Sequence, residues 1–324
     1  MNISSRFVNP ETHHSLIQEE DKLIDSITRA KVAVLQDGIP RFVSPADNYA
    51  ESFGWQWKHW SDNLSESRGA NIKHRQLILD RTHFLDYELN GKAILECGMG
   101  GGDDTEVLIT LPFAEIHSFD LSTSVERAAQ NLKDERLVLS QASIYAIPYE
   151  DYSFDFVFCH RVLQHTPDPE KSLRSICKKV RPNGILFVHS YKRSLEYMSE
   201  WRYKYRYLTT RMPKALIYIY VRVFGWPLYH LVGLLYKLGH VPRGFAYRCV
   251  PFYRIDRSGY CSKMDKAEAI ELSRMITFDA LTPKYDSPMT TYDLKRILQD
   301  EGFAIEHLED RFASPIYATA RRIG

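Results

Sequence analysis

The sequence predicts an α/β fold in which parallel strands are joined by helical crossovers. Apolar strands of about 5 residues alternate with helical segments of about 10 to 15 residues through the central part of the chain, and this alternation implies right-handed βαβ units. The first strand, residues 94–97, runs directly into a glycine-rich turn at 98–102. Such a turn lets the backbone bend sharply and approach a ligand closely.

Composition predicts a cytoplasmic protein without a disulfide framework. The 324 residues leave room for one large domain with additions, and 42 basic against 41 acidic side chains give a net charge of +1. With this balance, the protein has no overall positive electrostatic potential that would attract nucleic acid. The five cysteines are scattered without a C-x-x-C pair, which favours a reducing compartment. Residues 1–6 include no apolar segment, so we expect no secretory signal.

The N-terminal extension, residues 1–90, is predicted to be largely helical. Apolar residues recur among charges between positions 15 and 36, a pattern typical of an amphipathic helix packed outside the core. Residues 61–90 are predicted to form helices that lead into the first strand, with Asn90 and Gly91 as the turn signal.

Three tryptophans lie close together in this extension, at Trp55, Trp57 and Trp60. They form either a lid over a bound ligand or the core of an N-terminal helical cap, and clustered aromatic side chains are more often core. Arg81 lies just ahead of the glycine-rich turn in sequence. It is either a partner for a carboxylate of the ligand or a surface cation.

The glycine-rich turn carries three alternating glycines behind an acid: Glu96, Gly98, Gly100 and Gly102. About 20 to 25 residues after the first strand, a second strand ends in Asp120, and an acid at this point can accept both ribose hydroxyls of a nucleotide-like ligand. The G-x-G-x-x-G spacing of dinucleotide-binding folds is absent from the turn. Helix N-capping, the alternative role for Asp120, is better met by Ser122 or Ser124.

This spacing, with an acid two residues before the first glycine, resembles motif I of the class I S-adenosylmethionine-dependent methyltransferases. The resemblance implies a Rossmann-like sheet of seven strands, parallel with a C-terminal antiparallel hairpin, and S-adenosylmethionine as the cofactor. It also implies that Asp120 and the neighbouring Leu121 lie at the ribose. The residues that the resemblance places around the methionine moiety are Glu96, Gly98, Met99, Gly100 and Gly102.

Two later segments, residues 141–149 and 153–169, resemble the third- and fourth-strand motifs of the same family and follow in the same order. Residues 141–149 resemble the third-strand segment, in which an acid meets the adenine amino group. Ser143 stands at the position of that acid and Ile144 follows it, and a hydroxyl can accept the same hydrogen bond. Residues 153–169 resemble the fourth-strand motif. The end of that strand lies beneath the transferable methyl group in the family, so His160 and Arg161 are expected to border the cofactor.

Two residues are candidates for catalysis. His165 follows the fourth strand and is the candidate general base, because histidine titrates near neutrality; a packing role is the alternative. Tyr191 follows the fifth strand and, with Ser190 before it, is expected to line the acceptor pocket. Alignment of the acceptor and exclusion of water are the other demands of methyl transfer.

The predicted acceptor is a small molecule methylated on oxygen or nitrogen, in secondary or cell-envelope metabolism. The Asn-Pro-Pro-Tyr signature of amino-group methylation on bases and glutamine is missing, and Cys159-His160-Arg161-Val162 stands in its place. Two alternatives stay open. One is a C-methyltransferase of a lipid-linked ring, which an apolar insertion would serve, and the other is a cofactor-binding interaction module without catalysis.

Residues 38–43 and 48–57 resemble the start of a bacterial methyltransferase subfamily in which a small zinc ribbon often comes first. The chain departs from that pattern because its first cysteine is Cys97. We therefore expect the metal site of the ribbon to be absent. His13 and His14 alone are too few for a metal site, and no metal is predicted.

The elements after the fourth strand complete the predicted sheet. A helical pattern over residues 170–180 is broken by Pro-Asn-Gly, and residues 185–190 form the fifth strand. Further on, residues 290–298 are a capped helix closed by Gly302. The closing antiparallel hairpin is expected from two strands, 303–309 and 313–320.

Residues 191–285 interrupt the predicted sheet. They hold 13 of the 20 tyrosines, and their apolar stretch 216–238 is interrupted by Arg222, Pro227 and His230, which argues against a transmembrane helix. We favour a helical cap over the active site. A membrane-surface or homodimerisation helix pair is the main alternative, and single-stranded nucleic-acid binding is disfavoured by the balanced charge. The predicted domains are residues 1–90, 91–190 with 286–324, and 191–285.

Overall fold

The structure, a computed structural model, describes residues 4–43, 49–60, 71–255, 264–311 and 315–324. The chain forms two compact units. Unit 1 consists of Met1–Ala50, Gln76–Lys192 and Tyr285–Gly324, and unit 2 consists of Glu51–Arg75 and Arg193–Lys284. Each unit is described separately below.

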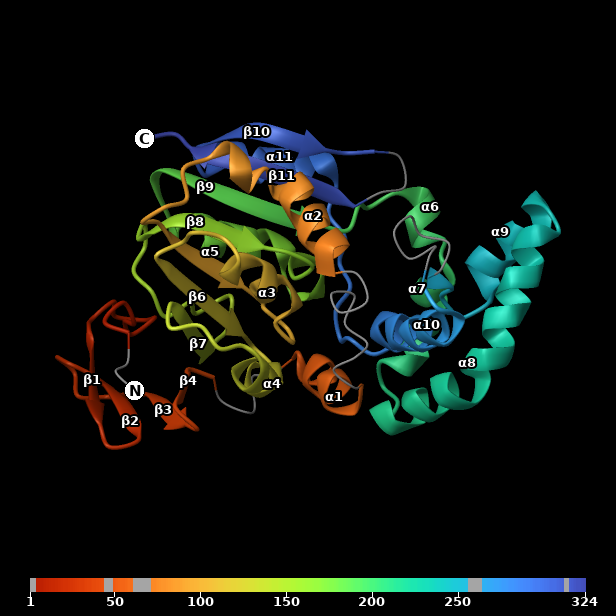
Figure 1. Ribbon diagram of the computed structural model, residues 1–324, viewed down its shortest axis with the longest axis horizontal. Coiled ribbons are helices and arrows are strands. Elements are labelled where there is room, and N and C mark those ends of the chain that lie inside the picture. Colours follow the sequence, from red (N-terminus) through yellow and green to blue (C-terminus); the bar gives the residue numbers. More distant parts are fainter. Residues whose placement is uncertain (1–3, 44–48, 61–70, 256–263, 312–314) are drawn as a thin grey trace. The chain divides into compact units, whose positions relative to one another are not determined.

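Unit 1 contains a sheet in the order β1-β2-β3-β4-β7-β6-β5-β8-β9-β11-β10 (Figure 1). The seven strands from β7 to β10 confirm the predicted sheet: β7, β6, β5, β8 and β9 are parallel, and β11 and β10 close it as an antiparallel pair. The central strands are β5 Ala93–Cys97, β6 Glu115–Asp120, β7 Leu137–Gln141, β8 Phe154–Cys159 and β9 Val180–Ser190, and the closing pair is β10 Phe303–Glu309 and β11 Ile316–Arg322. The predicted start of the last strand, Ala313, lies outside the described residues.

The predicted helix over residues 15–36 is wrong, because this segment forms strands that extend the sheet to eleven. Asp25 explains the difference. Its buried carboxylate accepts hydrogen bonds from Asn9 Nδ2 (2.7 Å), Thr12 Oγ1 (2.6 Å) and the backbone N–H of Thr28 (2.8 Å), which fixes a turn where a helix would have continued. The four added strands are β1 Leu16–Glu19, β2 Lys22–Asp25, β3 Lys31–Gln36 and β4 Ile39–Arg41.

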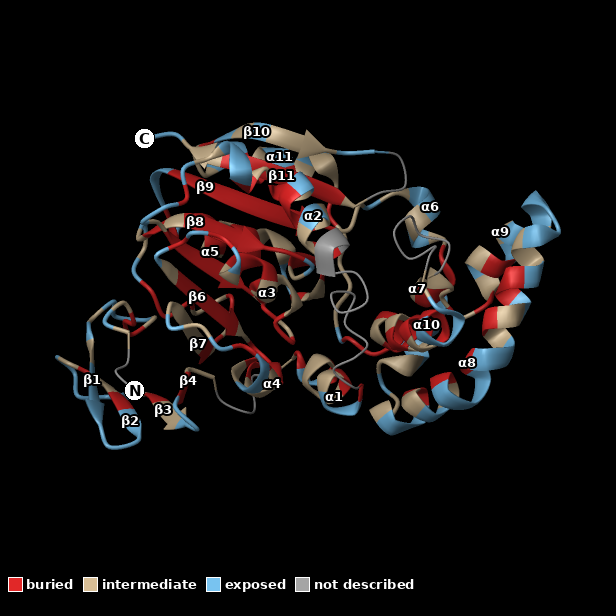
Figure 2. Ribbon diagram, in the orientation of Figure 1, coloured by how far each residue is buried: buried red, intermediate tan, exposed pale blue. Residues whose placement is uncertain are grey.

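Helices cover both faces of the sheet, and side chains of β5 alternate between them. Ile94 packs in a cluster with Ile78 and Phe84, whereas Leu95 packs in another cluster with Leu173. Figure 2 shows the central strands almost wholly buried between these layers. The helices of unit 1 are α2 Asn71–Thr82, α3 Asp103–Ile109, α4 Ser124–Asn131, α5 Pro169–Cys177 and α11 Thr291–Asp300, with short 3₁₀ helices at Phe84–Asp86 and Leu163–His165. Helix α2 begins in unit 2 at Asn71, and residues 61–70 of the predicted helical segment lie outside the described residues.

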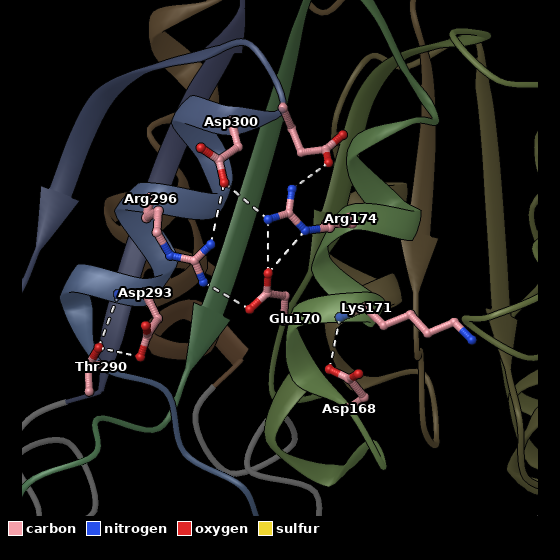
Figure 3. Close-up of polar contacts among 9 residues, drawn as sticks. Asp168, Glu170, Lys171, Arg174, Thr290, Asp293, Arg296 and Asp300 are labelled. Atoms are coloured by element: carbon pink, nitrogen blue, oxygen red, sulfur yellow. Dashed lines mark hydrogen bonds and ion pairs between the residues drawn. The ribbon is translucent and has the colours of Figure 1, made fainter.

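Two helices on one face, α5 and α11, are joined by ion pairs (Figure 3). Arg174 on α5 contacts Asp300 on α11 (3.1 Å), and Arg296 on α11 contacts Glu170 on α5 (2.9 Å). The predicted cap of α11 is confirmed, since Thr290 Oγ1 accepts from the N–H of Asp293 at 3.0 Å. Helix α5 ends at Cys177, earlier than predicted, because β9 already begins at Val180 and runs through the Pro-Asn-Gly sequence.

Unit 2 is helical, so the predicted helical character of the insertion is confirmed. Trp55 stacks on Phe278 and Trp60 is tilted against it, each with ring centroids 5.1 Å apart, so Trp60 lies in the core of this unit and Trp55 packs against that core. By length and composition, α8 is the one helix of the described chain that could cross a membrane. The helices are α1 Glu51–His59, α6 Leu195–Met198, α7 Trp201–Thr209, α8 Lys214–Lys237, α9 His240–Cys249 and α10 Lys266–Leu281.

Candidate cofactor and acceptor site

The glycine-rich turn lies between the carboxyl end of β5 and the start of α3. The N–H groups of Gly98 and Met99 both donate to the carbonyl of Phe119 on β6, at 2.8 and 3.1 Å, which anchors the turn. Gly98 has φ +81°, and a Cβ there would lie 2.3 Å from Cγ2 of Val162. No other residue type fits this position without displacing Val162. Gly102 is similarly tight, because its Cβ would lie 2.8 Å from Cδ1 of Leu132.

Asp120, at the carboxyl end of β6, ties this turn to the next one. Its carboxylate accepts from the N–H of Gly100 at 2.9 Å, and from the N–H and hydroxyl of Ser122 at 2.8 and 2.6 Å. Either Ser122 or Ser124 was expected to cap the following helix, and this expectation is wrong: Thr123 holds the N-cap position of α4 without a side-chain bond. The nearby carboxylate engages the Ser122 hydroxyl instead.

Glu96 is buried beneath the glycine turn. One carboxylate oxygen, Oε2, accepts from the hydroxyls of Thr105 and Ser118, both at 2.7 Å. The other oxygen, Oε1, is buried and has no hydrogen-bond partner among the described residues. Burial raises the pKa of Glu96 to about 8. A buried oxygen of this kind is satisfied either by its own proton or by a bound donor such as an ammonium group.

The raised pKa of Glu96 makes stability depend on pH in a defined direction. Between its ordinary value of 4.5 and about 8, the folded protein holds a proton that the unfolded chain has lost. Stability therefore falls as pH rises through this window. Glu96→Gln removes the dependence, so this variant should be more stable than the wild type above pH 8 by on the order of a few kcal/mol, and the difference should shrink towards pH 4.5. Urea unfolding of both proteins across this range measures the effect; parallel curves would contradict it.

The predicted adenine-side residues follow β7. Ser143 Oγ accepts from the N–H of Tyr145 at 3.2 Å, and Ile144 is buried. The carbonyl of Leu121 accepts from Nε2 of Gln141 at 2.8 Å, which links the ends of β6 and β7. Ser143, Ile144 and Leu121 thus lie on the same edge of the sheet as Asp120.

An aromatic group that sequence reasoning missed lies at this edge. The ring of Tyr49 is 6.4 Å from that of Tyr145 and 5.8 Å from that of Tyr285. Burial raises the pKa of Tyr49, and the ring of Tyr145 and the carboxylate of Asp120 add to the rise. The only available signal was the position of Tyr49 within the segment 48–57 that resembles a methyltransferase subfamily.

His160, at the end of β8, is fully buried in a cluster of polar groups. Its Nδ1 lies 2.7 Å from Oδ2 of Asp104 on α3, and its ring centroid is 4.9 Å from that of His189 on β9. Burial lowers the pKa of both histidines. Arg161 has φ +61° and an exposed side chain, and its N–H donates to Nδ1 of His189. Asp104 and His189 were not predicted, because they come from elements far apart in sequence.

The two predicted catalytic residues lie next to each other. The rings of His165 and Tyr191 are 5.8 Å apart and nearly perpendicular. Nδ1 of His165 lies 3.2 Å from the carbonyl oxygen of Tyr285; a carbonyl only accepts, so this nitrogen carries the proton. The carbonyl of Tyr191 accepts from the N–H of Met289 at 3.0 Å. The chain after the insertion therefore holds both residues at this edge.

One group of the described residues could hold a metal ion, namely His83, Asp86 and His307. The two imidazole rings are parallel and stacked, with centroids 3.8 Å apart, so their in-plane lone pairs do not converge on one point. Asp86 lies 3.3 Å from the ring nitrogen of His83 and 3.7 Å from that of His307. The stacking of the two rings and their contacts with Asp86 explain why these three residues lie together, without a metal ion.

Comparison with known proteins agrees with this geometry. Residues 95–188 match the family described as "Methyltransferase domain". An uncharacterised protein of Synechococcus sp. is 29% identical over 174 residues, which cover 52% of this chain and 38% of that protein. A ubiquinone biosynthesis O-methyltransferase of Cupriavidus pinatubonensis is 33% identical over 151 residues, which cover 43% of this chain and 56% of that protein. The chain thus spans about half or less of the length of these relatives.

Among solved structures, magnesium protoporphyrin IX methyltransferase from Synechocystis PCC 6803 with bound SAH aligns with a TM-score of 0.47. Its sequence is 14% identical, and the alignment covers 86% of this chain and 98% of that one.

Proposed function

This chain carries a methyltransferase domain of the S-adenosylmethionine-dependent class at residues 95–188, and from this premise we propose that the protein methylates an oxygen or nitrogen of a small molecule. The proposal is supported chiefly by the way the glycine turn lies against two acidic side chains, Asp120 and Glu96. Gly100 donates to Asp120, while Glu96 lies buried beneath the same turn.

The residues present fit S-adenosylmethionine. The unpartnered Oε1 of Glu96 suits the ammonium group of the methionine moiety, because a buried anion gains most from a charged donor. The absence of a Cβ at Gly98 makes room for Val162 and allows the positive φ that the tight turn requires. Asp120 would hold the ribose, with Leu121, Ser143 and the buried Ile144 on the adenine side.

Methyl transfer requires no covalent bond between the substrate and a side chain of the protein. The cofactor, when bound, supplies an electrophilic methyl group, so the chain must align the acceptor and take its proton. His165 would take that proton at Nε2, since Nδ1 donates to the carbonyl of Tyr285. Tyr191, in contact with His165, would orient the acceptor. The His160–Asp104 pair would position the backbone at the end of β8.

Oxygen is the preferred acceptor atom in this proposal. A relative with 33% identity is named a ubiquinone biosynthesis O-methyltransferase, and a hydroxyl acceptor must lose a proton, which gives His165 a role. Carbon methylation of a lipid-linked ring is the second candidate. It is favoured by the exposed apolar residues of α8, among them Leu216, Ile219 and Val223.

An acceptor screen tests the proposal. The protein is incubated with S-adenosylmethionine and panels of phenols, catechols, amines and ring-bearing lipids, and formation of S-adenosylhomocysteine is measured. Turnover with a hydroxyl or amine acceptor is expected, and turnover only with ring carbon supports the second candidate. Cofactor binding without turnover on any panel would favour a non-catalytic binding module and count against the proposal.

A further inference from the structure

A long segment of unit 2 carries positive charge without any negative charge. Residues 201–255 contain ten lysines and arginines and no aspartate or glutamate, although the whole chain has a net charge of only +1. This segment covers α7, α8 and α9. Several of its cations are used internally: Arg206, for example, is buried and donates to the carbonyls of Ala280 and Pro283. Others, including Lys237, Arg243 and Arg248, are exposed.

Helix α8 also exposes an apolar face. Its inner face is buried against α10 and α9, through residues such as Val221 and Val232. Its outer face is pale blue in Figure 2 yet carries large apolar side chains at helical spacing, and these side chains stay exposed among the residues of unit 2 that the structure describes. The exposed apolar residues of α8 are Leu216 (49% exposed), Ile219 (54%), Val223 (59%), Phe224 (52%), Trp226 (58%), Leu231 (43%) and Leu234 (54%), followed by Leu238 (61%) just beyond the helix.

The packing of the inner face fixes the orientation of α8 within unit 2, so the apolar face is exposed in this packing. Gly225 and Gly233 lie on the buried side, and the side chains of Arg274 and Arg254 occupy the space that a Cβ would need at these glycines. Arg254 donates to the carbonyl of Tyr229. The protein-facing side is therefore closely packed, with Arg274 and Arg254 against its two glycines, while large apolar residues lie on the exposed side.

Charge and apolar surface coincide where α8 meets α9, over residues 231–248, which we call the α8–α9 tip. Leu234, Leu238, Val241 (85% exposed) and Phe245 (57%) are its exposed apolar residues. Its exposed cations are Lys237, Arg243 and Arg248. Amphipathic helices with apolar and basic residues side by side bind the interface of bilayers that contain anionic lipids.

We propose that the α8–α9 tip docks on an anionic lipid bilayer, with its apolar side chains in the interface and its cations at the headgroups. Helix α8 lies on the bilayer and does not span it, because its other face packs against α10 within unit 2. A second copy of the chain is a poorer occupant. Pairing of two tips would bring Lys237, Arg243 and Arg248 close to their own copies, with no acid in the segment to neutralise them.

Co-sedimentation with vesicles tests the proposal. The whole protein should bind vesicles of phosphatidylcholine with phosphatidylglycerol, bind phosphatidylcholine alone only weakly, and lose affinity as salt rises. Reversing three charges (K237E, R243E, R248E) should lower the affinity at least about 100-fold. Removing three apolar side chains (L238S, V241S, F245S) should reduce binding to background. All six residues are exposed, so folding should be retained.

Matched controls come from unit 1. Ile27→Ser removes an exposed apolar side chain (70% exposed) and Lys133→Glu reverses an exposed charge; both should bind like the wild type. Equal binding to neutral and anionic vesicles, or wild-type binding by both triple variants, would overturn the proposal. Sedimentation velocity is run in parallel: a dimer that the same substitutions dissociate, in a protein that ignores vesicles, would identify a second copy as the occupant and also overturn it.

Discussion

Replacing His165 by alanine is expected to lower kcat by about 10²- to 10⁴-fold, the usual contribution of a positioned general base, and to leave the affinity for S-adenosylmethionine unchanged. The reason lies in the contacts of the ring. Because Nδ1 donates to the carbonyl of Tyr285, Nε2 is left with the lone pair that can accept a proton from a hydroxyl acceptor. Turnover with the acceptor found by the screen measures the effect.

An asparagine at the same position separates catalysis from packing. The side-chain amide introduced by His165→Asn can still donate to the Tyr285 carbonyl, but it cannot accept a proton at neutral pH. If His165 is the base, this variant should melt like the wild type and be as slow as the alanine variant. His307→Asn, on β10, serves as the control and should keep full activity. An asparagine variant with wild-type kcat would show that the role of His165 is structural.

Gly98→Ala is expected to destabilise the protein by about 2 to 5 kcal/mol and to abolish measurable cofactor binding. Two costs combine: a side chain at positive φ costs about 1 to 2 kcal/mol, and overpacking of a tight site costs about 1 to 3 kcal/mol. The added Cβ would lie 2.3 Å from Val162, whose displacement would disturb the 3₁₀ helix that carries His165. Denaturant unfolding and calorimetric titration measure the two effects.

Gly91→Ala is the matched control for this substitution. Gly91 also has positive φ (+72°), but a Cβ there would meet nothing within 4 Å. This variant should therefore show only the conformational cost, about 1 to 2 kcal/mol, and bind the cofactor normally. If both alanines had the same effect, the contact between Gly98 and Val162 would not be what makes the turn intolerant.

The central strands β5 and β8 were predictable because their burial is continuous or nearly so. Ala93–Cys97 is buried at every position, and a short run of this kind bounded by turn residues is typical of a strand in a sheet covered on both faces. The N-terminal strands were not predictable in the same way. Apolar residues between 15 and 36 fit helical spacing, and the buried carboxylate of Asp25, which decides for strands and turns, finds its partners Asn9 and Thr12 outside that window.

The candidate site was predictable where one short segment supplies several of its parts. The glycine turn and Asp120 were found in this way, because their spacing follows one βαβ unit. Residues assembled from separate elements were not found. Asp104 on α3 meets His160 after β8, and Tyr49 meets Tyr285 across most of the sequence. Nothing in the local sequence indicates these contacts, because only the completed fold brings the residues together.

Isothermal titration of the purified protein with S-adenosylmethionine and with NAD tests the central claim most directly. The glycine spacing and the acids Glu96 and Asp120 predict micromolar binding of S-adenosylmethionine and of S-adenosylhomocysteine, and no binding of NAD. Asp120→Ala should weaken the first two by about 1 to 3 kcal/mol, the cost of losing a charged hydrogen-bonding partner. Binding of NAD without a response to S-adenosylmethionine would contradict the account.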